Sequence, residues 1–258
     1  HEWDGYSSNI TFVGLQNYAE LLRTDRFWNS VVVNWIVVIG TIIAQMSVAL
    51  LLALVLSRKV RGMKIFRTAA FTPQVLSIAA VGMIWTLIYD PYQGLLNGVL
   101  QALGFENFRI AWLGNTNTAL LAMLWTTTWF YFGFHTLLFM AGLAAIPDEY
   151  YDAARLETNR WYHTLRYITL PLLREQLLIS FVLMFSGAFG HIMGLFFLMT
   201  RGGPAGRTEL MGLYMERLGF RAGQVGMASA ISILMLITVF LVVIWPAILI
   251  SRERLEYS

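Results

Sequence analysis

The sequence contains no cysteine, and charged side chains make up only 13% of its 258 residues. The lack of cysteine excludes a disulfide framework and thiol chemistry. A soluble domain carries charge on about a quarter of its residues, spread along the polar faces of its helices and strands. With 57% hydrophobic residues and a mean hydropathy of +0.61, this chain is therefore not a soluble domain.

The few charged residues are grouped, so that long stretches of the chain contain no Asp, Glu, Lys or Arg. The five stretches are residues 27–57, 68–89, 110–147, 176–200 and 222–251. Each can supply the roughly 20 apolar residues that cross about 30 Å of hydrocarbon as a helix. Continuous apolar runs do not fit the alternating pattern of a membrane β-barrel strand. We predict an all-α integral membrane protein with helices near residues 28–57, 69–89, 118–146, 176–200 and 226–250.

The distribution of Lys and Arg between alternate loops predicts the orientation of these helices. Residues 58–67, residues 148–175 and the C-terminal tail together hold eleven Lys and Arg, and the other side holds seven. Because basic residues favour the cytoplasmic side, the C-terminus is expected inside and the N-terminus outside. A polar start on the outer side indicates that at least one helix precedes residue 1.

Polar side chains recur at helical spacing within the apolar stretches. The two stripes consist of Asn34, Thr41 and Gln45, and of Thr128, Tyr131 and His135. Each stripe lies on one helical face, and polar groups in a membrane are expected to face a neighbouring helix or a cavity. Both stripes are therefore predicted to face the protein interior, as hydrogen-bonding contacts between helices or as part of a solute path.

The fourth stretch places Gly187, Gly190 and Gly194 on one face, with His191 beside them. Glycine is costly in a helix, so this pattern indicates the close approach of another helix or of a ligand. An imidazole at this depth needs a hydrogen-bond partner, which a sugar hydroxyl could provide.

Several chemistries are not expected of this sequence, and no catalytic residue is predicted. The four histidines are not paired at metal-ligand spacing, so no metal site is expected. There is no Gly-Lys-Ser/Thr phosphate loop for ATP hydrolysis. The apolar stretches contain no Asp or Glu, which argues against a proton-coupled carrier.

The segment between the third and fourth stretches carries a recognisable motif. Residues 147–157, PDEYYDAARLE, are predicted to form a helix with proline in its first turn and acids near its N-terminus. DAARLET, then NRWYHTLRY, then ITLP closely resemble the E-A-A loop of ATP-binding-cassette (ABC) importer permeases. In that family the loop, here residues 147–171, docks on the cytoplasmic ATPase and couples its closure to transport.

The resemblance covers essentially residues 12–254. FVGLQNY, SRKVRGMKIFRT, YDPYQGLLN, WLG and LMTRGGP are similar, in this order, to the sugar-permease branch of the family typified by the large maltose permease subunit. It implies a type I ABC importer transmembrane domain, with five of six core helices within this chain, in a bacterial cytoplasmic membrane. It also implies a second permease subunit, two ATPase subunits that bind ATP and Mg²⁺, and an extracytoplasmic solute-binding protein. No cofactor is expected in this chain, and no nucleic-acid partner.

The resemblance also implies roles for individual residues. The expected sugar contacts are Thr127, Phe130, Tyr131, Phe134, Met184, Gly187 and His191. The expected ATPase-coupling residues are Glu149, Asp152, Ala153, Ala154, Arg155, Leu156 and Thr158. The sequence departs from the family pattern at two of these positions, because Asp152 replaces a glutamate and Thr158 replaces a glycine.

Two alternatives remain open at this point. One is a permease for glycerol-3-phosphate or a glycerophosphodiester, since the same branch resembles those proteins. The other is a membrane enzyme or a secondary carrier, which would need an intramembrane acid, a metal cluster or a nucleophile pair that this sequence does not contain.

Overall fold

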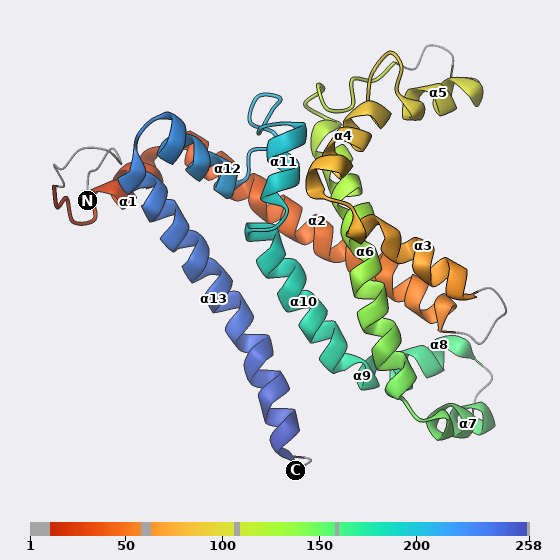
Figure 1. The fold of residues 1–258 in the computed structure, drawn as a ribbon. Helices are drawn as coiled ribbons and strands as arrows, with labels where there is room; N and C mark the ends of the chain where they lie inside the picture. Colours follow the sequence, from red (N-terminus) through yellow and green to blue (C-terminus); the bar gives the residue numbers. More distant parts are fainter. Residues whose placement is uncertain (1–10, 58–62, 106–108, 158–159, 257–258) are drawn as a thin grey trace.

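The computed structural model describes residues 11–57, 63–105, 109–157 and 160–256. Figure 1 shows that these residues form an assembly of helices, which confirms the predicted all-α class. The long helices are α2 (Asp25–Leu56), α6 (Ala119–Ala145) and α13 (Val225–Glu256). The shorter elements are α1 (Gln16–Arg23), α3 (Met63–Val75), α4 (Ile78–Ile88), α5 (Leu95–Ala102), α7 (Asp148–Glu157), α8 (Trp161–Thr164), η1 (Leu165–Thr169), α9 (Leu170–Leu172), α10 (Arg174–Phe189), α11 (Met193–Met199), α12 (Met211–Glu216) and η2 (Arg217–Arg221).

Three of the described helices are long and apolar enough to cross a membrane on their own. They are α2, α6 and the part of α13 from Val225 to Pro246. Two bent pairs pass the same test together. They are Arg67–Val75 with Ile78–Ile88, bent by 104°, and Trp161–Leu172 with Arg174–Phe189, bent by 69°. The chain therefore supplies up to five crossings if each bent pair is one span.

The stretch expected to form one helix near residues 69–89 is broken into α3 and α4. Pro73 lies inside α3, where it has no N–H to donate and its ring disfavours a continuing helix. Helix α3 ends two residues later, at Val75, and Ser77 is the N-cap residue of α4. The Ser77 hydroxyl accepts a hydrogen bond from the Ala80 N–H at 3.2 Å, which satisfies a free donor at the new helix start.

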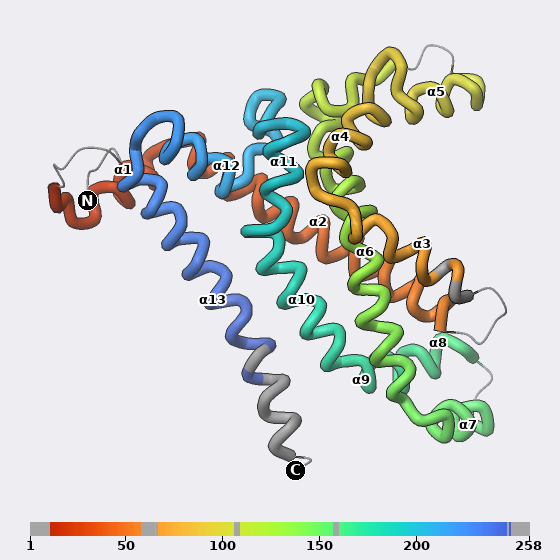
Figure 2. The backbone as a smooth tube through the Cα atoms, in the orientation of Figure 1, coloured from red at the N-terminus to blue at the C-terminus, as the bar shows by residue number. Residues whose placement is uncertain are grey.

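The stretch near residues 176–200 is also broken. Helix α10 ends at Phe189, and Gly190 has a non-helical backbone with φ −129° and ψ −72°. The carbonyl of Gly187 accepts hydrogen bonds from the N–H groups of Gly190 and Ile192, at 3.1 and 3.2 Å. These bonds satisfy backbone groups where the regular ladder stops, and α11 then continues toward the same end of the molecule as α4 and α12 (Figure 2).

Glycine allows two close crossings of α6. A Cβ atom added to Gly133 would collide with the backbone carbonyl of Ala70 in α3. A Cβ atom added to Gly142 would lie 2.6 Å from the Leu173 side chain, at the start of α10. Close backbone approach through glycine is a common way for membrane helices to pack. Helix α6 is thus fixed against α3 at one level and against the α10 region at another.

The predicted polar stripes face the interior. Asn34, Thr41 and Gln45 of α2 are 1%, 2% and 3% exposed, and Thr128 and His135 of α6 are each 5% exposed. The amide of Gln45 donates to the carbonyl of Thr127 at 3.4 Å, and so joins α2 to α6. These burial values confirm the interior faces predicted from spacing.

A buried carboxylate holds the end of the molecule where α1 and α12 lie. Glu209 is only 2% exposed, and its Oε2 accepts a hydrogen bond from Arg26 Nε at 2.8 Å. Arg217 forms a second ion pair with the same carboxylate. Because a buried charge is tolerated when it is paired and hydrogen-bonded, this cluster joins the start of α2, the loop before α12 and η2.

Adding a single methyl group is expected to have different effects at Gly133 and at Gly187. Gly133→Ala should lower the thermal unfolding temperature of the purified protein, because overpacking a helix crossing typically costs about 1–3 kcal/mol. Gly187→Ala is the matched control on α10, since an added Cβ there meets no described heavy atom within 4 Å. Equal unfolding temperatures for the two variants, measured in the same detergent, would contradict the close α3–α6 crossing.

Candidate functional site

A cavity of about 270 Å³ opens between α6, α10 and the facing parts of α2 and α3. Its lining residues are Gln45, Gln74, Tyr131, Phe134, His135, Leu183, Met184, Ser186, Gly187, Ala188, His191 and Ile192. They come from four segments that are distant in the sequence. Both helix breaks border the cavity, since Gln74 directly precedes the end of α3 and His191 follows the end of α10.

Most of the expected sugar contacts come together at this cavity. Those that line it are Tyr131, Phe134, Met184, Gly187 and His191. The structure thus places side chains from two helices, separated by about 50 residues of sequence, around one space. Contact of these residues with a solute remains a prediction.

Thr127 and Phe130 do not line the cavity. Thr127 is fully buried, and its hydroxyl donates to the carbonyl of Met123 at 2.7 Å within α6. Phe130 is 4% exposed and belongs to the main apolar core, with its ring centroid 4.6 Å from that of Tyr131. Both residues are buried among neighbouring parts of the protein and do not reach the cavity.

Gln45, Gln74 and His135 line the cavity as well, although they were not among the expected sugar contacts. Gln45 and His135 belong to the polar stripes, so their spacing predicted their burial. The spacing of polar residues gave no indication of Gln74. Its only signal in the sequence was its position beside Pro73, because a helix break changes the direction in which nearby side chains point. Its Oε1 atom is buried and finds no hydrogen-bond partner in the described part of the chain. An acceptor of this kind suits a hydroxyl donor from a solute.

The polar groups at the cavity are amides, hydroxyls and imidazoles. His135 Nδ1 lies 2.8 Å from the Ser180 hydroxyl, so α6 and α10 are joined directly beside the cavity. Among the described residues that line it, none is Asp, Glu, Lys or Arg. Two aromatic rings, Tyr131 and Phe134, supply apolar surface. Rings with a few directional polar groups are typical of sites for small polar molecules.

The expected coupling residues other than Thr158 lie on α7, at the opposite end of α6 from α4 and α5 (Figure 1). Ala154 is 5% exposed and is covered by the rest of the chain, whereas Leu156 is 91% exposed. Glu149, Asp152, Ala153 and Arg155 are exposed as well, with Arg155 Nη1 2.8 Å from Asp152 Oδ1. Thr158 lies outside the described residues. The helix therefore presents Tyr150, Ala153 and Leu156 together with several charged side chains away from the rest of the chain.

The pattern of the family described as "Binding-protein-dependent transport system inner membrane component" matches residues 36–255. The chain belongs to this family. The matched residues include all those that line the cavity and the whole of α7. The family therefore covers both the cavity and the expected coupling helix.

Three relatives have similar sequences along most of their length. A probable ABC transporter permease of Bacillus subtilis is 33% identical, with 92% of this chain and 81% of that protein covered. An sn-glycerol-3-phosphate transport system permease of Agrobacterium fabrum is 32% identical, with 92% and 80% covered. A diacetylchitobiose uptake system permease of Streptomyces coelicolor is 30% identical, with 91% and 69% covered.

A solved structure has a similar fold. The crystal structure of a bacterial ABC transporter involved in the import of the acidic polysaccharide alginate matches with a TM-score of 0.80. The match covers 93% of this chain and 84% of that one, at 19% sequence identity. At this identity the likeness shows the fold alone, which is that of an ABC importer transmembrane domain.

Replacing polar groups at the cavity should weaken solute use. His191→Leu and Gln74→Leu should each raise the KM for uptake about 2- to 10-fold, because a lost hydrogen bond is worth about 0.5–1.5 kcal/mol. Gln176→Leu is the matched control, because its amide Oε1 is also buried without a described partner but does not line the cavity. An unchanged KM in both cavity variants would remove these residues from the site.

Proposed function

We propose that this chain is the permease subunit of an ATP-driven importer for an uncharged sugar or oligosaccharide. The observation that carries the proposal is the lining of the cavity, with two aromatic rings beside hydrogen-bonding groups and no Asp, Glu, Lys or Arg in the described part. Sugars present apolar ring faces together with hydroxyls, so they can use both kinds of surface. The relative named for diacetylchitobiose uptake supports the same substrate class.

A permease for glycerol-3-phosphate or a glycerophosphodiester is the second candidate, because one relative is named for sn-glycerol-3-phosphate transport. A phosphate group is normally bound by Arg, Lys or several backbone N–H groups. A cavity with no Arg or Lys among its described lining residues would leave the phosphate charge uncompensated, which is costly. The cavity therefore favours the neutral solute.

The working transporter would contain a second permease subunit, two ATPase subunits and an extracytoplasmic binding protein. ATP and Mg²⁺ would be bound by the ATPase subunits and not by this chain. We place α7 and the C-terminus on the cytoplasmic side and the N-terminus outside. In support, α7 and the C-terminal end of α13 lie at one end of the molecule, and α1 lies at the other (Figure 1).

The connection between α6 and α10 suggests how ATP use reaches the cavity. Residues 146–173 leave α6, form α7 and return as α10, so both main walls of the cavity are attached to the same segment. A displacement of α7 by the closing ATPase subunits would therefore move both walls. Such a movement is what alternating access requires.

Uptake by the reconstituted transporter distinguishes the two substrate classes. Proteoliposomes with the complete complex and its binding protein should accumulate a labelled neutral oligosaccharide when ATP is inside, and should not accumulate glycerol-3-phosphate. A matched control omits ATP. Accumulation of glycerol-3-phosphate with no uptake of any neutral sugar would overturn the proposal.

The role of α7 can be tested separately from the cavity. Ala153→Trp should abolish uptake and weaken co-purification of the ATPase subunits, because the new side chain enlarges an exposed docking surface without disturbing the packing of this chain. Leu103→Trp is the control, since Leu103 is 70% exposed at the end of α5. Normal uptake by Ala153→Trp would exclude α7 as the coupling helix.

A further inference from the structure

Helix α2 carries polar side chains along one face, from its first turn to the cavity between α6 and α10. This α2 polar stripe consists of Arg26, Ser30, Asn34, Thr41 and Gln45. Spacings of four and seven residues keep these side chains on one side of a helix. The last four are at most 3% exposed. Polar groups are costly inside a membrane protein, so a stripe of this length calls for a functional explanation.

The two ends of the α2 polar stripe reach different cavities. Gln45 lines the cavity of the candidate site. Arg26 lines a cavity of about 590 Å³ at the end of the molecule where α1 and α12 lie, together with Asn29, Arg201 and Glu209. The two cavities share no lining residue. The stripe therefore joins two open spaces through a part of the protein that is closed in this structure.

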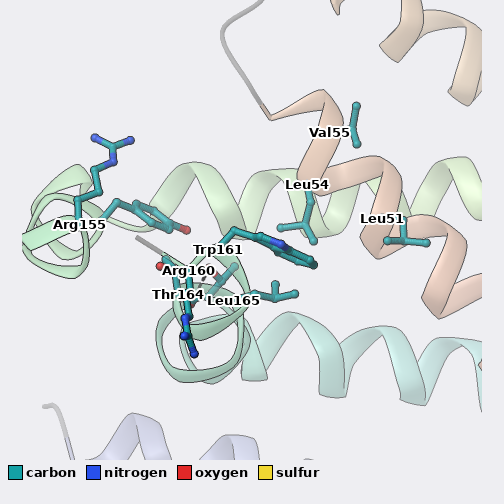
Figure 3. Close-up of a pocket in the computed structure, with 10 residues that line it drawn as sticks. Leu51, Leu54, Val55, Arg155, Arg160, Trp161, Thr164 and Leu165 are labelled. Atoms are coloured by element: carbon teal, nitrogen blue, oxygen red, sulfur yellow. Dashed lines mark hydrogen bonds between the residues drawn. The ribbon is translucent and has the colours of Figure 1, made fainter. Parts of the chain in front are cut away.

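Beyond Gln45, toward α7, the same face of α2 is apolar. The positions that continue the stripe are Val48, Leu52 and Val55. Figure 3 shows a third cavity, of about 450 Å³, against this part of the helix, and the α2 side chains that line it are Leu51, Leu54 and Val55. The polar face thus leads from the candidate site toward Arg26, which is the outer end in the orientation proposed above.

Asn34 lies in the closed middle of the stripe. Its side chain is 1% exposed, and neither Nδ2 nor Oδ1 has a hydrogen-bond partner in the described part of the chain. Ser30 and Thr41 differ in this respect, because their hydroxyls donate to the carbonyls of Phe27 and Val37 in α2 itself. A buried amide without partners destabilises the fold. Such a residue is expected where another state of the protein uses it.

A second unpartnered group lies on α6. Thr128 is 5% exposed, and its hydroxyl oxygen finds no hydrogen-bond partner among the described residues. It stands one turn before Tyr131, which lines the candidate site, and next to Thr127, whose carbonyl accepts from Gln45. Asn34 and Thr128 both precede the cavity-lining residue of their helix, so both lie on the side away from α7.

We propose that the solute reaches the candidate site along the α2 polar stripe, from the cavity beside Arg26, and that Asn34 exchanges hydrogen bonds with it on the way. The proposal rests on the import function proposed above. The path is closed around Asn34 in this structure, and it opens when the ATPase subunits close and the walls of the cavity move. Sugar hydroxyls can donate to Oδ1 and accept from Nδ2, so the passing solute supplies the partners that the amide lacks.

The absence of cysteine from this chain allows a direct test of the path. Asn34→Cys introduces a single thiol. A small, membrane-impermeant methanethiosulfonate reagent is added outside proteoliposomes that hold the complete transporter and its binding protein, and modification of this chain is read by mass spectrometry. The reaction should be about tenfold faster with ATP inside than without it, because a thiol buried among apolar groups stays protonated and unreactive. The modified transporter should no longer take up the labelled neutral oligosaccharide.

Ala53→Cys is the matched control. Ala53 belongs to the same helix and is 0% exposed, but it lies beyond Gln45 and packs in a separate apolar cluster with Phe139 and Leu143. Its thiol should stay unmodified with and without ATP. Equal modification of the two thiols would show general opening of the protein and overturn the path. The same conclusion follows if Asn34→Cys reacts at one rate in both conditions, or not at all.

Asn34→Leu tests the hydrogen bonds with the solute. Leucine has the branched shape of asparagine without its polar atoms, so the unfolding temperature should not fall. The kcat/KM for uptake should fall about 2- to 10-fold, because hydrogen bonds in transit are lost. Gln176→Leu is the control, since it also removes a buried amide oxygen without a described partner, away from the stripe. An unchanged kcat/KM in Asn34→Leu would remove this residue from the path.

The labelling experiment also separates this proposal from the proposed substrate class. The rate at which Asn34→Cys reacts depends on ATP and not on which solute is carried. Import of glycerol-3-phosphate in place of a neutral sugar would overturn the substrate class, whereas ATP-independent labelling would overturn the path.

Discussion

The fold depends on one constraint, which is that hydrocarbon offers no hydrogen-bond partner to a free backbone N–H or C=O. A break in a membrane helix is therefore tolerated only where the protein itself supplies partners. The Ser77 hydroxyl does so for the start of α4, and the Gly187 carbonyl does so where α10 ends. Both breaks border the same cavity, so the places where regular helix stops are also the places where polar groups such as Gln74 and His191 line open space.

The helical class and the membrane character could be predicted from the sequence, because hydropathy and charge are properties of composition along the chain. The breaks could not, since Pro73 and Gly190 each lie within an apolar stretch that could equally form a kinked but continuous helix. Glycine spacing left the neighbour open for a similar reason. The stretch with Gly187 and Gly194 was expected to face another helix or a ligand; Gly187 lines the cavity and a Cβ atom on Gly194 would lie 3.6 Å from Ile78, whereas the closest approach to the backbone of another helix occurs at Gly133. Spacing identifies a helix face and does not identify the neighbour that covers it.

The candidate site was predictable in part. Spacing placed Tyr131 and His135 on an interior face of one helix, and family resemblance added residues of the other helix. Neither could show that the Thr127 carbonyl accepts a hydrogen bond from Gln45, because that contact joins residues 82 positions apart. Gln74 was missed because its direction depends on the bend after α3. Contacts between distant segments thus decide which members of a polar stripe reach open space.

The crossing of α3 and α6 has a consequence for the way the walls of the cavity are held together. Ala70 and Gly133 approach backbone to backbone, so neither helix can move closer to the other at this level. Gln74 lies one turn beyond Ala70, and Tyr131 and Phe134 lie on either side of Gly133, so the amide and both aromatic rings belong to one closely packed wall. Met184 and His191 belong instead to α10 and the break that follows it. The contact between His135 and Ser180 joins this second wall to α6, so the two sides of the cavity are held together by a polar contact beside the open space.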